Sequence, residues 1–311
     1  MTRSVRHWAS LGESTFVAGT WLLWGVYRVF GRTLFRLCLV PVVFWYWAVS
    51  PTARSASLQY LRRVQAVHGV IGHAPGWRDT LRHFRSFAET LLDKLLAISG
   101  RYPFDRVRLE GADAVLRTMA SGRGAMIVTA HVGCLELCRA LADEHGGFAL
   151  TVLVHTAHAE NFNRILQRLD PGSRVRLLQA GEVGAATAVL LGERVARGEL
   201  VAIVGDRVPV HTNRTTTLPF LGADAQFPIG AYVLAALLQC PLFFMGCVRE
   251  GEGHVMVYEQ LSERVELPRG GRDEALREVA GRYVRSLETL VRRAPFEWFN
   301  FFPFWDQGKT R

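Results

Sequence analysis

Short apolar runs between residues 125 and 206 constrain the fold more than any other feature of this 311-residue chain. Each run has the length and composition of a strand that is buried on both faces, and helical periodicity follows the first three. The runs are AMIVTA (125–130), FALTVLVH (148–155), VRLLQA (175–180) and LVAIVGD (200–206), and the helical segments are 133–145, 161–169 and 185–197. This alternation predicts an α/β fold with a mainly parallel, twisted sheet flanked by helices.

The rest of the chain extends this pattern. Residues 51–100 and 229–239 have helical periodicity, PLFFMGCVRE and HVMVYEQL are expected to be strands, and 273–293 is expected to be an amphipathic helix. Neither an internal repeat nor a long linker divides this region. We therefore expect two parts, a membrane-associated helical segment over residues 1–50 and an α/β domain over residues 51–311.

The segment 15–49 is apolar and aromatic, and only arginines interrupt it. Arg28, Arg32 and Arg36 are spaced by four and would share one face of a continuous helix. Their guanidinium groups could reach lipid phosphates while the other faces enter the bilayer, and the aromatic residues 44–47 suit the headgroup boundary. We expect a hydrophobic membrane-anchoring helix that either spans the bilayer or lies in its interface. The alternative is a helical hairpin buried on the protein itself.

The formal net charge of +9, carried mostly by arginine, favours an anionic partner: nucleic acid, anionic lipid or an acidic carrier protein. The chain contains no nucleic-acid-binding motif, so we expect no nucleic-acid partner. Phosphate-binding glycine loops and the G-x-S-x-G nucleophile motif are also missing from the sequence. The five scattered cysteines are expected to be reduced, buried thiols of a cytoplasm-facing protein.

The segment TAHVGCLEL places His131 at the end of the first strand and Glu136 one turn into the next helix. Such a carboxylate could accept the Nδ1 proton of the imidazole and leave Nε2 free to act as a base, with Gly133 allowing a tight turn. His155, followed by Glu160, has the same spacing and also ends a strand. A third such pair, at positions 254 and 259, lies within one expected strand and would point to opposite faces. The spacing therefore leaves both His131 and His155 open.

Three blocks resolve this choice through a resemblance. TAHVGCLEL resembles the H-x-x-x-x-D/E motif of the glycerolipid and lysophospholipid acyltransferase superfamily, especially of the bacterial lipid A late acyltransferases. VGDRVPVHTNRTTTLPFLGADAQFPIGAYVLAA is similar to the downstream block of that family, and APFEW (294–298) to its Ala-Pro-x-x-aromatic segment.

The resemblance implies transfer of a fatty acyl chain from an acyl thioester, on acyl carrier protein, to a hydroxyl or amine of a membrane lipid or glycolipid. The expected location is the cytoplasmic face of the bacterial inner membrane. His131 would be the general base, Glu136 would stabilise its imidazolium, and backbone N–H groups near Gly133 would bind the oxyanion. No metal or cofactor is required. Further residues that match family blocks would shape the substrate site: Arg164, Asp206, Arg207 and Arg214.

The end of the chain departs from the family pattern. Lipid A acyltransferases tend to carry a basic run after the terminal aromatic residue, whereas this chain has WFNFFPFWDQ, a membrane-facing lid or core packing. The acceptor is therefore expected to be less anionic than phosphorylated lipid A. The alternatives are a Cys134 nucleophile, a metal site at His131, Cys134 and Cys138, and a non-catalytic, membrane-peripheral lipid-binding protein.

Overall fold

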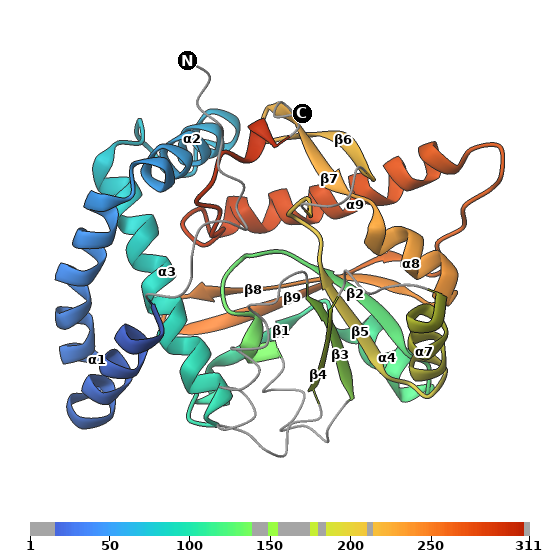
Figure 1. Cartoon of the computed structure of the whole chain (residues 1–311), viewed down its shortest axis with the longest axis horizontal. Coiled ribbons are helices and arrows are strands. Elements are labelled where there is room, and N and C mark those ends of the chain that lie inside the picture. The colour runs from blue at the N-terminus through green and yellow to red at the C-terminus, as the bar shows by residue number, and fades with distance from the viewer. Residues whose placement is uncertain (1–15, 139–148, 155–174, 180–184, 210–213, 308–311) are drawn as a thin grey trace.

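The computed structural model describes residues 16–138, 149–154, 175–179, 185–209 and 214–307. Within them, seven strands form one sheet in the order β1-β9-β8-β2-β5-β3-β4 (Figure 1). All neighbours are parallel except the antiparallel pair β8 and β9, so the prediction of a mainly parallel sheet is confirmed. The strands are β1 (Val107–Glu110), β2 (Ala125–Thr129), β3 (Leu150–Val154), β4 (Val175–Gln179), β5 (Leu200–Val204), β8 (Leu242–Glu250) and β9 (Gly253–Ser262).

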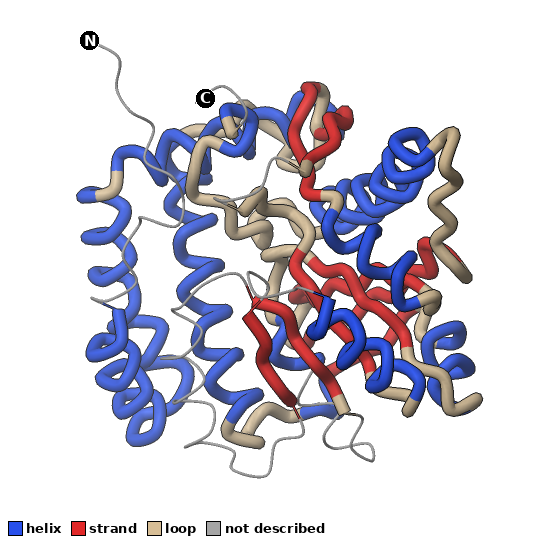
Figure 2. Tube along the Cα trace, turned by 45° about the vertical axis from the view of Figure 1, so that its right-hand side comes forward, coloured by secondary structure: helices blue, strands red, loops and turns tan. Residues whose placement is uncertain are grey.

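Helices cover both faces of this sheet (Figure 2). Side chains of α2, α7, α8 and α9 pack on one face, and those of α1, α3 and α4 pack on the other. The helices are α1 (Phe16–Val49), α2 (Pro51–His68), α3 (Trp77–Ile98), α4 (Asp113–Ala120), α7 (Ala185–Ala196), α8 (Gly230–Leu238) and α9 (Arg272–Arg293). The expected helices at 51–100, 185–197, 229–239 and 273–293 are confirmed, whereas β1 and α4 had not been predicted.

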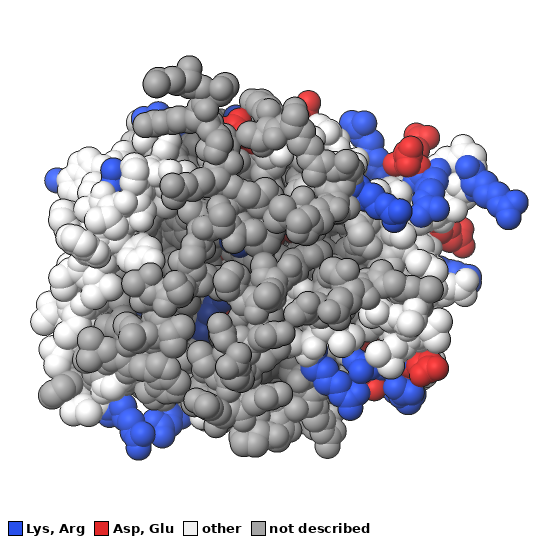
Figure 3. Space-filling model, viewed as in Figure 1, with Lys and Arg blue, Asp and Glu red and all other residues white. Residues whose placement is uncertain are grey.

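Helix α1 is broken at Gly31, where the backbone leaves the helical conformation with φ of 75° and ψ of −172°. The expectation that Arg28, Arg32 and Arg36 share one face of a continuous helix is therefore wrong. Among the described helices, none is by itself long and apolar enough to cross a membrane. The two helices 33–49 and 51–68, bent by 96°, meet that criterion only when taken together. The surface over α1 carries few charged side chains (Figure 3).

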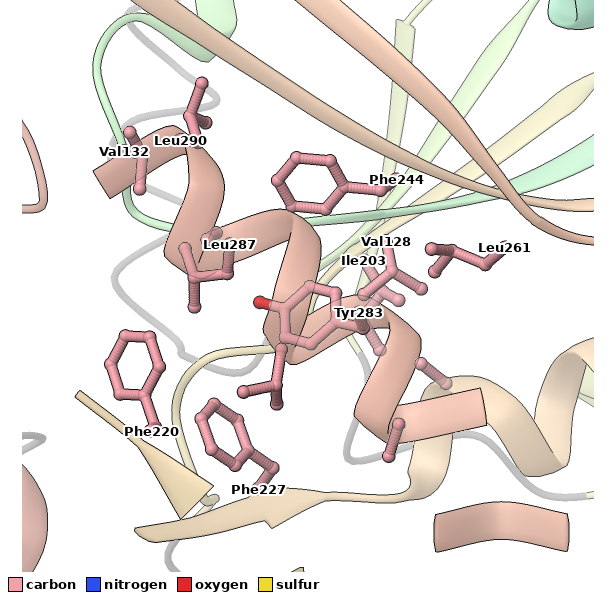
Figure 4. Close-up of a cluster of buried hydrophobic side chains, with 14 of the residues drawn as sticks. Val128, Val132, Ile203, Phe220, Phe227, Phe244, Leu261, Tyr283, Leu287 and Leu290 are labelled. Atoms are coloured by element: carbon pink, nitrogen blue, oxygen red, sulfur yellow. The ribbon is translucent and has the colours of Figure 1, made fainter. Parts of the chain in front are cut away.

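The strand β2 divides the core in two because its residues alternate between the faces. Met126 and Val128 belong to the cluster under α9, and Ala125 and Ile127 to the cluster under α1 and α3. In the first cluster Tyr283 of α9 lies among residues of β2, β5 and β8 (Figure 4). All five residues of β2 are buried, which explains why the sequence shows a continuous apolar run there.

A two-stranded hairpin and the C-terminal segment close one end of the fold. The hairpin consists of β6 (Thr215–Phe220) and β7 (Ala223–Pro228), and its turn residues Leu221 and Gly222 both have positive φ. The indole of Trp305 donates a hydrogen bond to the carbonyl of Phe220. The aromatic residues of WFNFFPFWDQ are mostly buried, so this segment is core packing rather than a membrane-facing lid.

Candidate active site

The candidate site lies where β2 and β5 end side by side. These strands are parallel neighbours, with Thr129 opposite Val204, so the residues that follow them meet at the same edge of the sheet. Gly205 continues the pairing by donating its N–H to the carbonyl of Thr129 at 2.8 Å. The next residues on the two strands are therefore brought together: His131 after β2 and Asp206 after β5.

His131 and Asp206 form a hydrogen-bonded dyad. The Nδ1 atom of His131 lies 2.7 Å from Oδ1 of Asp206, and the backbone N–H of His131 donates to Oδ2 at 3.0 Å. Trp298 donates its indole N–H to the same Oδ2 at 2.8 Å. Asp206 is 1% exposed and the His131 side chain 35% exposed. An aspartate that accepts at Nδ1 places the proton there and leaves the Nε2 lone pair available to a substrate hydroxyl.

The charges of the site favour an ionised aspartate and a neutral histidine. Burial alone would raise the pKa of Asp206, but His131, Arg207 and the Trp298 hydrogen bond outweigh it and lower the pKa to about 2. Desolvation lowers the pKa of His131, and the positive charge of Arg207 adds to this effect, while Asp206 opposes it. The imidazole is thus uncharged at neutral pH, as a general base must be.

Glu136, expected to hold His131, has a different partner. Its Oε1 lies 3.0 Å from the ammonium of Lys94 on α3, and its Oε2 lies 4.0 Å from the Cys134 thiol. The carboxylate at Nδ1 is Asp206, so the expected contact between Glu136 and Nδ1 is wrong. Two isolated bridges, Val132 with Trp298 and Gly133 with Cys247, fix the chain between His131 and the helical turn that begins at Leu135.

Gly133 has the backbone conformation for which a glycine was expected, and its backbone also packs closely against the protein. Its φ is 58°, and a Cβ at this position would lie 1.8 Å from the carbonyl oxygen of Cys247. Its N–H donates to the carbonyl of Glu297 at 2.9 Å, and the N–H of Cys134 donates to Cys247 at 3.0 Å. These two amides are engaged inside the protein, so neither of them is a free oxyanion donor.

The other residues that matched family blocks are scattered. Arg207 is half-buried beside the dyad, where its guanidinium donates to the carbonyl of Phe299 at 3.1 Å and lies over the Phe302 ring. Arg214 is exposed immediately before β6, and its carbonyl accepts from Ile229. Arg164 lies outside the described residues.

The two other histidine–glutamate pairs with this spacing do not form a comparable site among the described residues. His155 and Glu160 also lie outside the described residues. His254 is buried in β9 against the Tyr102 hydroxyl, and Glu259 accepts a hydrogen bond from Ser286. Their different surroundings agree with the expectation that residues five apart on one strand face opposite ways.

All five cysteines are free; four of them are buried as expected, whereas Cys38 is half-buried. Burial, followed by the charge of Glu136, raises the pKa of Cys134 well above its usual range. A thiol of this kind is a poor nucleophile, which argues against the Cys134 alternative. Among the described residues, no group of three or more His, Cys, Asp or Glu side chains has an arrangement that could hold a metal ion.

Two residues of the site had no predicted role. Trp298 lies in the APFEW segment, whose similarity to the family was noted without a function for the indole. Lys94 stands in the apolar stretch LLDKLLAI, and only two of the 37 basic residues of the chain are lysines. A rare lysine within an apolar helical run was a usable signal, because a buried ammonium requires a partner.

The fold and the site together define an α/β protein with a histidine–aspartate pair at adjoining ends of parallel strands. The family model for bacterial lipid A biosynthesis acyltransferases matches residues 87–307, which include the dyad, Glu136 and Trp298. The chain therefore belongs to this family of acyltransferases. Comparison with curated protein sequences gave no match.

Proposed function

We propose that the chain transfers a fatty acyl group from an acyl thioester, carried by acyl carrier protein, to a hydroxyl or amine of a membrane lipid. His131 is the general base and Asp206 is the carboxylate that orients it. The observation that carries this proposal is the 2.7 Å contact between Nδ1 and Asp206 at the strand ends, in a chain that belongs to an acyltransferase family.

The chemistry needs no covalent enzyme intermediate. Nε2 of His131 takes the proton of the acceptor hydroxyl while the hydroxyl oxygen forms a bond to the thioester carbonyl carbon. The negative charge of Asp206 stabilises the imidazolium that results. The tetrahedral intermediate then collapses, the carbon–sulfur bond breaks, and the imidazolium returns the proton to the departing thiolate. The products are an acylated lipid and free thiol.

The outer face of α1 is suited to a membrane surface. Phe35, Leu39 and Val43 of this helix pack inward, whereas Leu37 and Trp45 are each 67% exposed. Other apolar residues on the same stretch are also exposed: Val40, Val42, Phe44, Tyr46 and Val49. A helix with one packed and one exposed apolar face is typical of interfacial attachment. We propose that it binds the cytoplasmic face of the inner membrane.

Flotation with phosphatidylethanolamine–phosphatidylglycerol vesicles tests this attachment. The double variant Leu37→Ser, Trp45→Ser is expected to lose most of its vesicle binding. Val189→Ser removes a comparably exposed apolar side chain from α7 and should bind as the parent does. Equal flotation by the parent and the double variant would exclude α1 as the contact surface.

Transfer of a labelled acyl chain from acyl carrier protein by the detergent-purified protein tests the reaction. The acceptors are a phosphorylated lipid A precursor, a neutral glycolipid and an aminolipid. The aromatic composition of WFNFFPFWDQ, where the family tends to be basic, favours the two less anionic acceptors. His131→Ala is expected to abolish transfer, while His73→Ala, which changes an exposed histidine between α2 and α3, should retain it. Equal turnover by parent and His131→Ala would refute the role of the dyad. Failure of the parent with every acceptor would favour a non-catalytic lipid-binding protein.

A further inference from the structure

Lys94 is an unusual residue for its position on α3. Its neighbours in the same helix, Leu92 and Leu96, are buried in the core, and its own side chain is only 26% exposed. Asp93, the adjacent carboxylate, is fully buried and pairs with Arg249 instead. Burial opposes the charge of Lys94, but Glu136 outweighs it and raises the pKa of the ammonium. Lys94 is therefore a desolvated cation kept charged by Glu136.

This cation reaches the loop that carries the general base. Glu136, its partner at 3.0 Å, lies in the helical turn that directly follows this loop. The positive charges of Lys94 and Arg207 both act on the imidazole and lower the pKa of His131. Arg207 is engaged with the Phe299 carbonyl and the Phe302 ring. A lysine ammonium has three N–H donors, of which a single ion pair uses one.

The loop itself offers little to a developing negative charge. Four successive backbone N–H groups from His131 to Cys134 donate to protein acceptors: to Asp206, and to the carbonyls of Ala130, Glu297 and Cys247. Acyl transfer generates an oxyanion that needs donors of fixed orientation. Because these four amides are engaged, a side chain close to the loop is a suitable source of the donor, and among the described residues Lys94 is a cation that contacts Glu136 there.

We propose that Lys94 is the oxyanion-binding residue and that Glu136 is a positioning residue that acts through it. The inference rests on the proposed acyltransfer reaction and deepens it. As the acceptor oxygen adds to the thioester, the carbonyl oxygen gains the negative charge and accepts a hydrogen bond from the Lys94 ammonium. When the carbon–sulfur bond breaks, the electron pair of the oxyanion re-forms the carbonyl double bond, the negative charge leaves with the thiolate, and the hydrogen bond from Lys94 weakens. Glu136 thus holds the lysine rather than the histidine.

A double-mutant cycle tests the proposal. Lys94→Met is expected to lower kcat by roughly 100-fold or more with little change in KM, since the donor acts mainly in the transition state. Glu136→Gln should lower kcat by a similar factor. The kcat of the double variant should be no lower than that of Lys94→Met alone, because both substitutions disrupt the same ion pair. The control Arg85→Met changes an exposed cation on the same helix and should retain activity.

The pH profile distinguishes this role from a structural one. Removing the Lys94 charge raises the pKa of His131, so the acidic limb of the kcat/KM profile should move to higher pH in Lys94→Met. Additive losses in the cycle, or parental turnover by Lys94→Met, would overturn the proposal while leaving the His131 dyad in place. Absence of transfer by the parent protein would overturn both.

A second measurement needs no catalysis. Because the chain has only two lysines, competitive acylation with acetic anhydride and mass spectrometry can follow Lys94 with Lys309 as the internal reference. Glu136→Gln removes the group that keeps Lys94 protonated, so the relative reactivity of Lys94 at pH 8 should rise several-fold. An unchanged ratio would show that Glu136 does not hold the lysine.

Discussion

The substitution Asp206→Asn probes the dyad with almost no change in shape. Oδ2 of Asp206 already accepts two hydrogen bonds, from the backbone of His131 and from the indole of Trp298. The amide oxygen of an asparagine would take this position, because both of those donors require an acceptor. The amide NH2 group would then face Nδ1, which must become an acceptor. The imidazole would change tautomer, with its proton on Nε2, and could no longer accept a proton from the substrate.

The size of the effect follows from the charge and the tautomer together. The pKa of Asp206 is about 2, whereas the usual value is 3.8, and burial opposes this shift. The lowering of the pKa corresponds to roughly 2 kcal/mol of net stabilisation of the charged form. A loss of about 2 kcal/mol at the imidazolium would cost roughly 30-fold in rate. With the wrong tautomer in addition, we expect kcat to fall by roughly 1000-fold or more.

The assay is steady-state transfer from labelled acyl carrier protein, with thermal unfolding measured in parallel. Asp206→Asn should also be less stable than the parent at pH 7, since a carboxylate with a depressed pKa stabilises the fold above its unfolded pKa and loses this contribution as the pH falls towards 2. Asp224→Asn changes an exposed aspartate on β7 and serves as the control. A fall in kcat of less than tenfold in a folded Asp206→Asn protein would refute the tautomer argument.

Three further outcomes are expected. Gly133→Ala should lower the free energy of unfolding, measured with denaturant, by at least about 3 kcal/mol, because the new methyl group would collide with the carbonyl oxygen of Cys247 and the residue has a positive φ. The control Gly192→Ala, within α7, should raise this free energy by up to about 1 kcal/mol. Burial raises the pKa of Glu297 to about 7, so the parent should lose stability as the pH rises from about 4.5 to 7; Glu297→Gln should flatten this dependence, and an unchanged slope would contradict the assignment. Trp298→Phe deletes one hydrogen bond to the carboxylate of the dyad and should lower kcat/KM about tenfold; retention of full activity would show that the indole is only packing.

The strands of the sheet were predictable because each is a short, continuous apolar run. The partner of His131 was not, because local pattern does not show which strands are neighbours in space. β2 and β5 lie side by side although β3 and β4 come between them in the sequence. Sequence proximity favoured Glu136, whereas the dyad joins residues 75 positions apart. The carboxylate itself was noted in the downstream block, but only as a substrate-site residue.

Other differences have equally specific causes. The break in α1 occurs at a glycine, but the apolar character of the whole stretch 15–49 indicated one helix. The hairpin of β6 and β7 was missed because its strands are mixed in polarity and depend on packing against α9 and the C-terminal segment for their burial. The two roles considered for the aromatic segment 298–307 could not be separated by composition, since a lid and a core are equally apolar.

The contribution of Trp298 to the dyad has a consequence for biosynthesis. The indole is 92 residues from the aspartate it contacts, and its backbone is held by His83 of α3, 215 residues earlier. A nascent chain that has emerged only as far as β9 already contains the base and its carboxylate, but not the group that fixes their orientation. The enzyme would therefore acquire its working geometry only late in translation, and premature termination would yield chains with an unassembled dyad.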